Sequence, residues 1–226
     1  MTTLTRASTR SFAIPQARAI AIAGTLLSLA GFVILMGIIT AEAVYPATYT
    51  THENEISDLG ATRPPNSIIR QPSARIFNAT MLGSGLIILG SAAFLIRTDE
   101  KRRVPYSLLF VGAGLVGVGL FPGNVTPFHG ISALLTFVSS GVAAILTGTA
   151  ARGPFRRFAI ALGVISLGSL LTAMLGDLTP AWDELGDGGV ERWVAYPVVV
   201  WLVALGAYFM GREARDQTVA PRERDI

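Results

Sequence analysis

Half of the 226 residues are hydrophobic, only 15% are charged, and the mean hydropathy is +0.53. A water-soluble domain carries about a quarter charged residues, so the composition excludes that class. The absence of cysteine excludes disulfides, thiolate catalysis and thiolate metal ligands. The pI of about 9.7 does not indicate nucleic-acid binding, because the arginines flank apolar segments, where membrane topology accounts for them.

The apolar residues form long runs rather than an amphipathic pattern. A helix of about 20 apolar residues crosses the hydrocarbon core because it satisfies its own backbone hydrogen bonds. The sequence therefore predicts an all-α, polytopic membrane protein, a bundle of six transmembrane helices. The expected spans lie near 19–44, 75–96, 104–121, 129–151, 157–176 and 191–210, within a transmembrane domain at 18–211. An N-terminal segment, 1–17, precedes this domain, and a flexible tail, 212–226, follows it.

Basic residues predict the orientation. The N-terminal segment together with Arg18, the loops at 97–103 and 152–157, and the C-terminal tail hold 14 of the 18 lysines and arginines. The opposite side holds the other four, which are Arg63, Arg70, Arg75 and Arg192. The positive-inside rule therefore places both termini in the cytoplasm.

Small residues dominate the third and fourth spans, and this composition favours close helix packing. A substrate path along the glycine face is the alternative. No internal repeat of the kind found in inverted-repeat transporters is evident, which weakens a transporter interpretation.

The polar residues that suggest a functional site lie at the non-cytoplasmic side. Both histidines, His52 and His129, fall there, and Asp177 and Glu191 stand at the facing ends of the fifth and sixth spans. Loops held by a rigid scaffold are frequent places for binding and catalysis. The catalytic candidates are His129, Asp58, Ser57, Asp177 and Glu191. The substrate-binding candidates are Arg75, Asn78, His52, Asn66 and Ser132.

Three functional hypotheses fit these residues. In the first, His129 is a general base for Ser57 or for water, Asp58 or Asp177 orients it, and Arg75 anchors a phosphate or carboxylate. In the second, His52, His129 and nearby carboxylates bind a metal, although no HxxxH-type spacing supports it. In the third, the same face binds lipid head groups without chemistry.

Each feature also has a purely structural interpretation. Asp58 and Arg75 would form an ion pair that closes the bundle, and His129 would cap its helix. The polar stripe at Ser132, Thr136 and Ser139 would make interhelical hydrogen bonds. The acids of 183–187 would belong to a solvated loop.

Three segments resemble a prokaryotic membrane family known as domain of unknown function 998. They are Glu55-Ile-Ser-Asp-Leu-Gly60, Gly119-Leu-Phe-Pro122 and the run from Phe128 to Phe137, and the resemblance covers about residues 20–210. The pattern also distantly resembles the DRAM and Frag-like six-span proteins, which carry an Ile-Ser-Asp-Thr-Gly loop followed by Pro-Pro-Glu. The departures are Asn66 in place of that glutamate and Arg192 before Trp193. Asn66 cannot replace a glutamate as a base.

The resemblance implies a six-helix bundle with its signature on the lumenal or extracellular side and, for one branch, action on lipids. We therefore expect a multi-pass cell-membrane protein that is a lipid-directed hydrolase or acyl-transfer enzyme with membrane lipids as partners. The alternatives are a non-enzymatic lipid-binding or scaffolding protein and, after it, a small-molecule transporter. No cofactor is predicted, with a metal at His52 and His129 as the minor alternative, and the sequence does not determine the oligomeric state.

Overall fold

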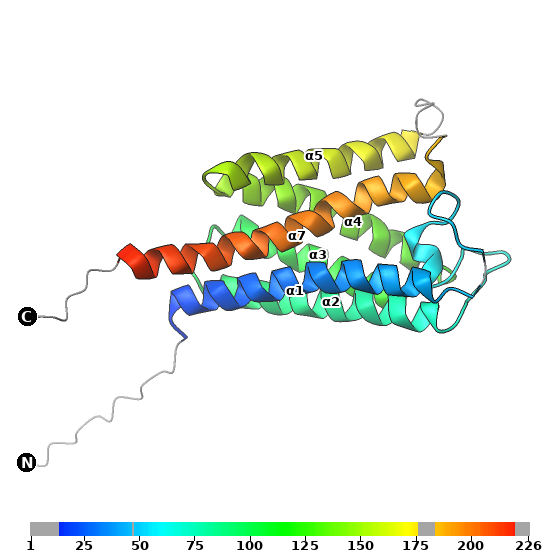
Figure 1. The fold of residues 1–226 in the computed structure, drawn as a ribbon, viewed down its shortest axis with the longest axis horizontal. Coiled ribbons are helices and arrows are strands. Elements are labelled where there is room, and N and C mark those ends of the chain that lie inside the picture. Colours follow the sequence, from blue (N-terminus) through cyan, green and yellow to red (C-terminus); the bar gives the residue numbers. More distant parts are fainter. Residues whose placement is uncertain (1–13, 47, 176–183, 220–226) are drawn as a thin grey trace, which may run out of the picture.

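The computed structural model describes residues 14–46, 48–175 and 184–219, with the backbone alone described from 213 to 219. It is a bundle of helices without strands in these described ranges (Figure 1). The long helices are α1 (Gln16–Ala43), α2 (Ser73–Ile96), α3 (Arg103–Leu120), α4 (Phe128–Ala150), α5 (Pro154–Leu175) and α7 (Gly186–Val219). All 6 are long and apolar enough to cross a membrane. The predicted fold class is confirmed.

Prolines mark where several helices begin. Pro15, Pro72 and Pro127 directly precede α1, α2 and α4, and Pro154 is the first residue of α5. The first N–H groups of a helix have no intrahelical acceptor, so a residue without an N–H loses nothing there. These prolines place the helix starts within a few residues of the positions that hydropathy predicts.

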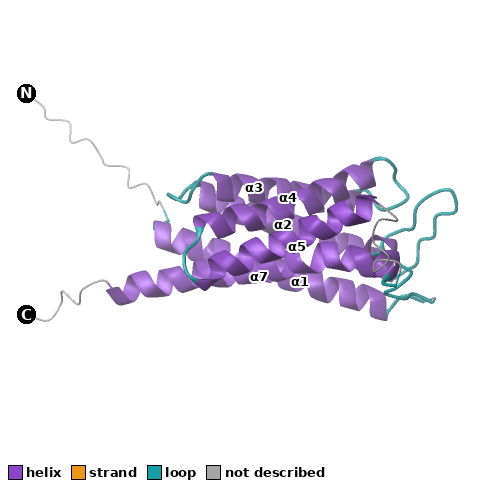
Figure 2. Cartoon of the chain, turned by 90° about the horizontal axis from the view of Figure 1, so that it is seen from above, coloured by secondary structure: helices purple, strands orange, loops and turns teal. Residues whose placement is uncertain are grey.

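The helices pack in chain order around a closed circuit. α1 packs against α2 and α7, α3 lies between α2 and α4, and α5 packs against α4 and α7. Figure 2 shows the helices running side by side, with the longer loops gathered at one end. α1 begins and α7 ends at the opposite end of the bundle (Figure 1). We call the end that carries segments 44–72 and 121–127 the distal end.

Close helix contacts depend on small residues in the membrane-length part. A Cβ atom on Gly206 of α7 would lie 2.3 Å from both the carbonyl oxygen of Gly24 and the hydroxyl oxygen of Ser28 on α1. Ser28 Oγ already donates to the carbonyl of Val203 at 3.0 Å. Between α2 and α3, a Cβ on Gly112 would lie 2.9 Å from the carbonyl oxygen of Gly85. Small residues let helix backbones approach where lipid provides no hydrophobic drive for association.

The last helix extends beyond its predicted limits. It begins at Gly186 rather than near 191, and its backbone stays helical to Val219 rather than ending near 210. The segment from Arg212 to Gln217 is rich in strong helix formers, and a single interior glycine, Gly211, costs only about 1 kcal/mol. The helix therefore continues into the segment predicted as a tail.

The Gly206 contact predicts a specific sensitivity to side-chain size. Gly206→Val should lower the melting temperature of the purified protein in detergent, because the added atoms have no room between α1 and α7 and such overpacking costs about 1–3 kcal/mol. Gly211→Val is the matched control, since a Cβ on Gly211 meets no atom within 4 Å. Equal melting temperatures for the two variants would contradict the packing described here.

Candidate functional site

A short 3-10 helix, η1 (Ile56–Leu59), is held at the distal end by its own capping groups and by burial. The Asp58 carboxylate accepts the N–H of Glu55 at 3.2 Å, and the N–H of Asp58 donates to the Glu55 carbonyl at 3.2 Å. Ile56 and Leu59 are buried in the core of the bundle. The Asp58 side chain therefore makes its hydrogen bond within its own turn. Burial of this side chain raises the pKa of its carboxyl group.

Arg192 on α7 fixes the loop that leads into η1. The guanidinium is buried and donates from Nη1 to the carbonyls of Thr51 (3.2 Å), Asn54 (3.1 Å) and Gly188 (2.8 Å). Its Nη2 donates to the hydroxyl of Tyr49 at 2.9 Å and pairs with the carboxylate of Glu42 at the end of α1. One side chain thus joins α1, the loop and α7.

Tyr49 extends this network to η1. Its hydroxyl donates to the carbonyl of Glu55 at 3.0 Å. Burial raises the pKa of Tyr49 above its ordinary value, so the hydroxyl keeps the proton that it donates. The position of Glu55 therefore depends on Arg192 through Tyr49.

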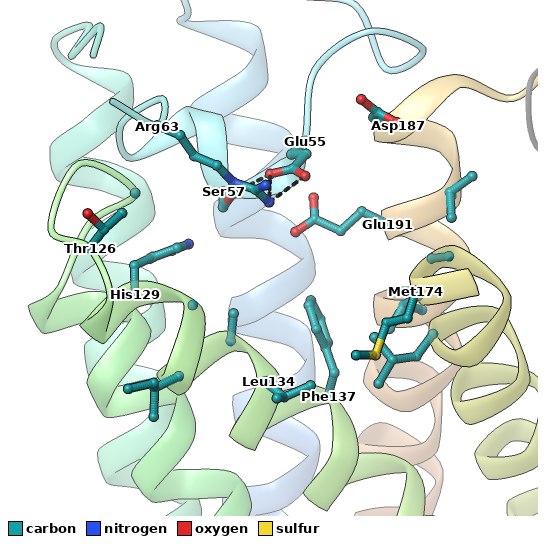
Figure 3. Close-up of a pocket in the computed structure, with 18 of the residues that line it drawn as sticks. Glu55, Ser57, Arg63, Thr126, His129, Leu134, Phe137, Met174, Asp187 and Glu191 are labelled. Carbon is teal, nitrogen blue, oxygen red and sulfur yellow. Dashed lines mark hydrogen bonds and ion pairs between the residues drawn. The ribbon is translucent and has the colours of Figure 1, made fainter. Parts of the chain in front are cut away.

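A cavity of about 1220 Å³ opens at the distal end between the loops and the ends of α4, α5 and α7. Figure 3 shows Glu55, Ser57, Arg63, His129 and Glu191 around its upper part, and Leu134, Phe137 and Met174 below them. The cavity thus has a polar part near the loops and an apolar part between the helices.

His129 is a buried histidine in the wall of this cavity, with 5% of its surface exposed. Its Nδ1 lies 2.7 Å from the carbonyl oxygen of Phe121. A carbonyl oxygen can only accept, so Nδ1 carries the proton and Nε2 of the neutral ring is left as an acceptor. The ring points into the cavity toward Ser57 and Glu191 (Figure 3).

Ser57 belongs to a polar chain at the cavity wall. Its hydroxyl donates to Glu55 Oε2 at 3.3 Å, and Arg63 Nη2 lies 2.7 and 2.8 Å from the two oxygens of that carboxylate. Opposite them, the Glu191 side chain reaches from α7 toward η1, where it accepts the N–H of Ile56. The site therefore brings together an imidazole, a hydroxyl and two carboxylates.

A second, narrower pocket of about 70 Å³ continues from this point into the bundle. Ser57, His129 and Glu191 line both the large cavity and this inner pocket. The rest of the inner pocket is mainly apolar and includes Ile34, Ile38, Phe77, Met81, Leu115, Val118, Val198, Val199 and Leu202. The three polar side chains therefore stand at the junction of a polar and an apolar space.

Of the residues singled out from the sequence, Ser57, His129, Glu191 and His52 line the cavity. Asp177 lies outside the described residues. The others, Asp58, Asn66, Arg75, Asn78 and Ser132, are not among the cavity-lining residues. Sequence reasoning therefore identified part of the cavity wall but also included residues that lie elsewhere.

The residues outside the cavity have other surroundings. Arg75 is exposed and makes no ion pair with Asp58. Asn66 is exposed, and Asn78 packs beside Gly60 with its Oδ1 buried. Ser132 packs against Gly117 of α3.

The polar stripe on α4 bonds to its own helix. Thr136 Oγ1 donates to the carbonyl of Ser132 at 2.8 Å, and Ser139 Oγ donates to the carbonyl of Thr136 at 3.3 Å. Hydroxyl groups in transmembrane helices commonly return to the preceding turn in this way. The stripe therefore does not supply the interhelical bonds that its spacing suggested.

The metal hypothesis gains no support from the described residues. No group of three or more histidine or acidic side chains in that part of the chain is arranged to hold a metal ion. His52 Nδ1 instead lies 2.6 Å from Glu53 Oε1 at the rim.

Sequence reasoning missed Glu55 and Arg63 as cavity residues. Glu55 stands three residues before Asp58, which is the spacing of a capping box, and Arg63 is the nearest basic residue that follows. That spacing was a usable signal for the turn. The ion pair that presents Glu55 to the cavity depends on the folded loop.

Family comparison agrees with the geometry of the bundle. The family model described as "Protein of unknown function (DUF998)" matches residues 28–208, from within α1 to within α7. The chain belongs to the DUF998 family. The matched region includes every residue that lines the cavity of this DUF998 protein. No curated protein and no solved structure matches the chain, and the resemblance to the DRAM and Frag-like proteins stays a hypothesis.

The Arg192–Glu42 pair gives the DUF998 protein a measurable structural dependence. Arg192→Met should lower the free energy of unfolding by about 3 kcal/mol, because it leaves the partly buried Glu42 carboxylate unpaired. The double variant with Glu42→Gln should recover part of this loss, since the uncompensated charge is then gone. Arg75→Met, at an exposed position, is the control. Equal effects of Arg192→Met and Arg75→Met on unfolding would contradict the role assigned to Arg192.

The raised pKa of Asp58 predicts a pH dependence of stability. Because the pKa of Asp58 is higher in the folded protein, the protonated carboxyl adds to the free energy of unfolding. This stabilisation is complete below the unfolded pKa of about 3.9 and is lost as the pH rises through the higher folded pKa. Asp58→Asn keeps an oxygen acceptor for the Glu55 N–H and does not titrate. From about pH 4 upward, the melting temperature of this variant should therefore rise relative to the unmodified protein. Parallel melting curves across pH would refute the assignment.

Proposed function

We propose that this DUF998 protein is a lipid-directed hydrolase or acyl-transfer enzyme that acts on an ester bond at the junction of its two cavities. The observation that supports this most is the position of Ser57, His129 and Glu191, which border both the polar cavity and the apolar inner pocket. In an ester lipid, the ester group lies between the polar head and the hydrocarbon chain. A lipid with its head in the cavity and only the first carbons of its chain in the inner pocket would have that bond beside these residues.

The cavity also has an exposed apolar boundary, formed by residues of α4 and α5. Ile131 on α4 and Met174 on α5 line it and are 60% and 66% exposed. Leu134, one helical turn after Ile131, is exposed as well. Exposed apolar side chains at a cavity mouth favour a ligand that enters from lipid rather than from water.

His129 supplies the base in this proposal. Its Nε2 accepts a proton from a water molecule or an acceptor alcohol as that oxygen attacks the ester carbonyl carbon. The protonated ring then returns the proton to the leaving alcohol oxygen as the carbon–oxygen bond breaks. Water gives a fatty acid and an alcohol, whereas an acceptor alcohol gives a new ester and the original alcohol.

The neighbouring side chains have supporting roles. The Glu191 carboxylate, on the facing wall, stabilises the imidazolium while it holds the proton. Ser57 is held by Glu55 and, in the described residues, makes no hydrogen bond to His129. We therefore assign the first attack to water or alcohol and keep Ser57 as the second candidate nucleophile.

The positive-inside rule supports a location for the reaction. The distal end carries four basic residues, whereas the opposite side carries the other 14 of the chain. We infer that the distal end faces away from the cytoplasm and that the enzyme uses lipids of the outer leaflet.

Loss of the base tests this proposal. With His129→Asn, the amide nitrogen can still donate to the Phe121 carbonyl, but the imidazole nitrogen that accepts the proton in this proposal is lost. Fatty-acid release from diacyl lipids in vesicles containing the purified protein should fall by about 100-fold or more, and lipid should still co-purify. Ser139→Ala, on the same helix outside the cavity, is the control.

The alternative is lipid binding without chemistry. It is favoured by one observation, the bonding of Ser57 and Arg63 to Glu55, which satisfies these groups without any substrate. Under this alternative, lipid binds but no fatty acid is released or transferred by the unmodified protein. Release that persists in the His129→Asn variant would exclude His129 as the base.

A further inference from the structure

The polar part of the cavity is lined by more acidic than basic side chains. Four acidic side chains, those of Glu53, Glu55, Asp187 and Glu191, belong to its described wall. Arg63 is the one lysine or arginine among its described lining residues. Figure 3 shows Asp187 above Glu191 on α7, facing the side that carries Arg63 and His129.

Arg63 already forms an ion pair with Glu55. The same Nη2 lies within 2.8 Å of both oxygens of Glu55, an arrangement that neutralises the charge of that carboxylate and of the guanidinium together. The pair therefore leaves Glu191 and Asp187 without a basic partner of their own in the described cavity wall.

The other arginines of the distal side are also accounted for. Arg192 is buried in its contacts with Glu42, Tyr49 and backbone carbonyls. Arg70 and Arg75 are exposed and do not line the cavity. The neighbouring stretch 176–183 contains no lysine or arginine in its sequence. Among the described residues of the distal side, every arginine is therefore either already paired or outside the cavity wall.

The groups that face the cavity without a complete set of partners are hydrogen-bond acceptors. His129 is nine-tenths buried, and no described residue donates to its Nε2. The carboxylate oxygens of Asp187, which is exposed at the mouth of the cavity, also accept. A ligand that complements this wall presents donors, and hydroxyl groups provide them without adding charge.

We propose that the lipid bound here has an uncharged, hydroxyl-bearing head group, such as a sugar or polyol on a diacylglycerol, and that phosphate-bearing anionic head groups are rejected. This inference rests on the proposed function, because it names the class of lipid that the same cavity takes. A phosphate in this position would face the Asp187 carboxylate and the acceptor Nε2 of His129, and the described cavity wall has no unpaired lysine or arginine to bind it.

The discriminating experiment compares two lipids that differ in the phosphate. Glucosyl-diacylglycerol and phosphatidylglycerol with identical acyl chains would be offered to the full-length protein in detergent, and each bound population would be measured by native mass spectrometry. The glycolipid should bind more tightly by a factor on the order of ten, the effect of one like-charge contact at a partly exposed site. Equal or tighter binding of phosphatidylglycerol would overturn the inference.

A charge reversal at the rim provides the second arm. Asp187→Lys adds a cation beside the cavity and should reduce the preference for the glycolipid by at least several-fold. Glu184→Lys is matched to it, because it makes the same charge change three residues away at a position outside the cavity wall. If both variants shift the preference equally, general surface charge determines the selectivity and the inference fails.

The outcomes also separate this inference from the proposed function. Binding of the glycolipid without ester cleavage would leave the head-group assignment standing and refute the enzyme. Cleavage of phosphatidylglycerol in preference to the glycolipid would support the enzyme and refute the head-group assignment. Failure of both lipids to bind would refute the two together.

Discussion

A buried guanidinium at the distal end determines how the first loop meets the last helix. Arg192 stays charged, and burying a charge costs free energy, so the hydrogen bonds and the ion pair of its guanidinium are needed to offset that cost. Its partners come from the end of α1, from residues 49–54 and from the first turn of α7. Glu191, the preceding residue, bonds instead to the N–H of Ile56. Two neighbouring side chains on α7 thereby hold the loop at two separate points and place η1 over the bundle.

This arrangement explains the gradient of polarity inside the protein. With η1 in place, Ser57 and Glu55 face His129 and Glu191 across the distal cavity, and the space below them is lined by α1, α2, α3, α4 and α7. A polar, water-soluble substrate would leave the apolar inner pocket unfilled. An amphiphile matches both parts at once, and this match is why we favour lipid chemistry over transport of a polar molecule.

The six helices were predictable because the bilayer imposes a strong local requirement. Each span needs an apolar run of sufficient length, and that run is visible without knowledge of any other part of the chain. The extension of α7 was not visible in this way, since its first turns contain Asp187 and Glu191 and its end contains charged residues. The first turns pack against residues 51–54, and the sequence at the end of the helix has high helix propensity, so neither segment depends on hydropathy.

The candidate site was predictable only in outline. The basic residues indicated which loops share one side, and this grouped Ser57, His129 and Glu191 correctly. The suggested pairing of Asp58 with Arg75 does not form, because Asp58 bonds within its own turn and Arg75 faces outward. The pairs that do form, Glu55 with Arg63 and Glu42 with Arg192, require the folded loop. Charge counting cannot distinguish these combinations.

The most direct test of lipid binding at the junction of the two pockets is an experimental structure of the protein purified with its native lipids and embedded in a nanodisc. We expect continuous lipid density with its head in the distal cavity and the start of its chain between Ser57, His129 and Glu191, at the entrance to the inner pocket. Lipid density found only on the outer surface of the bundle, with side chains closing the junction, would contradict it.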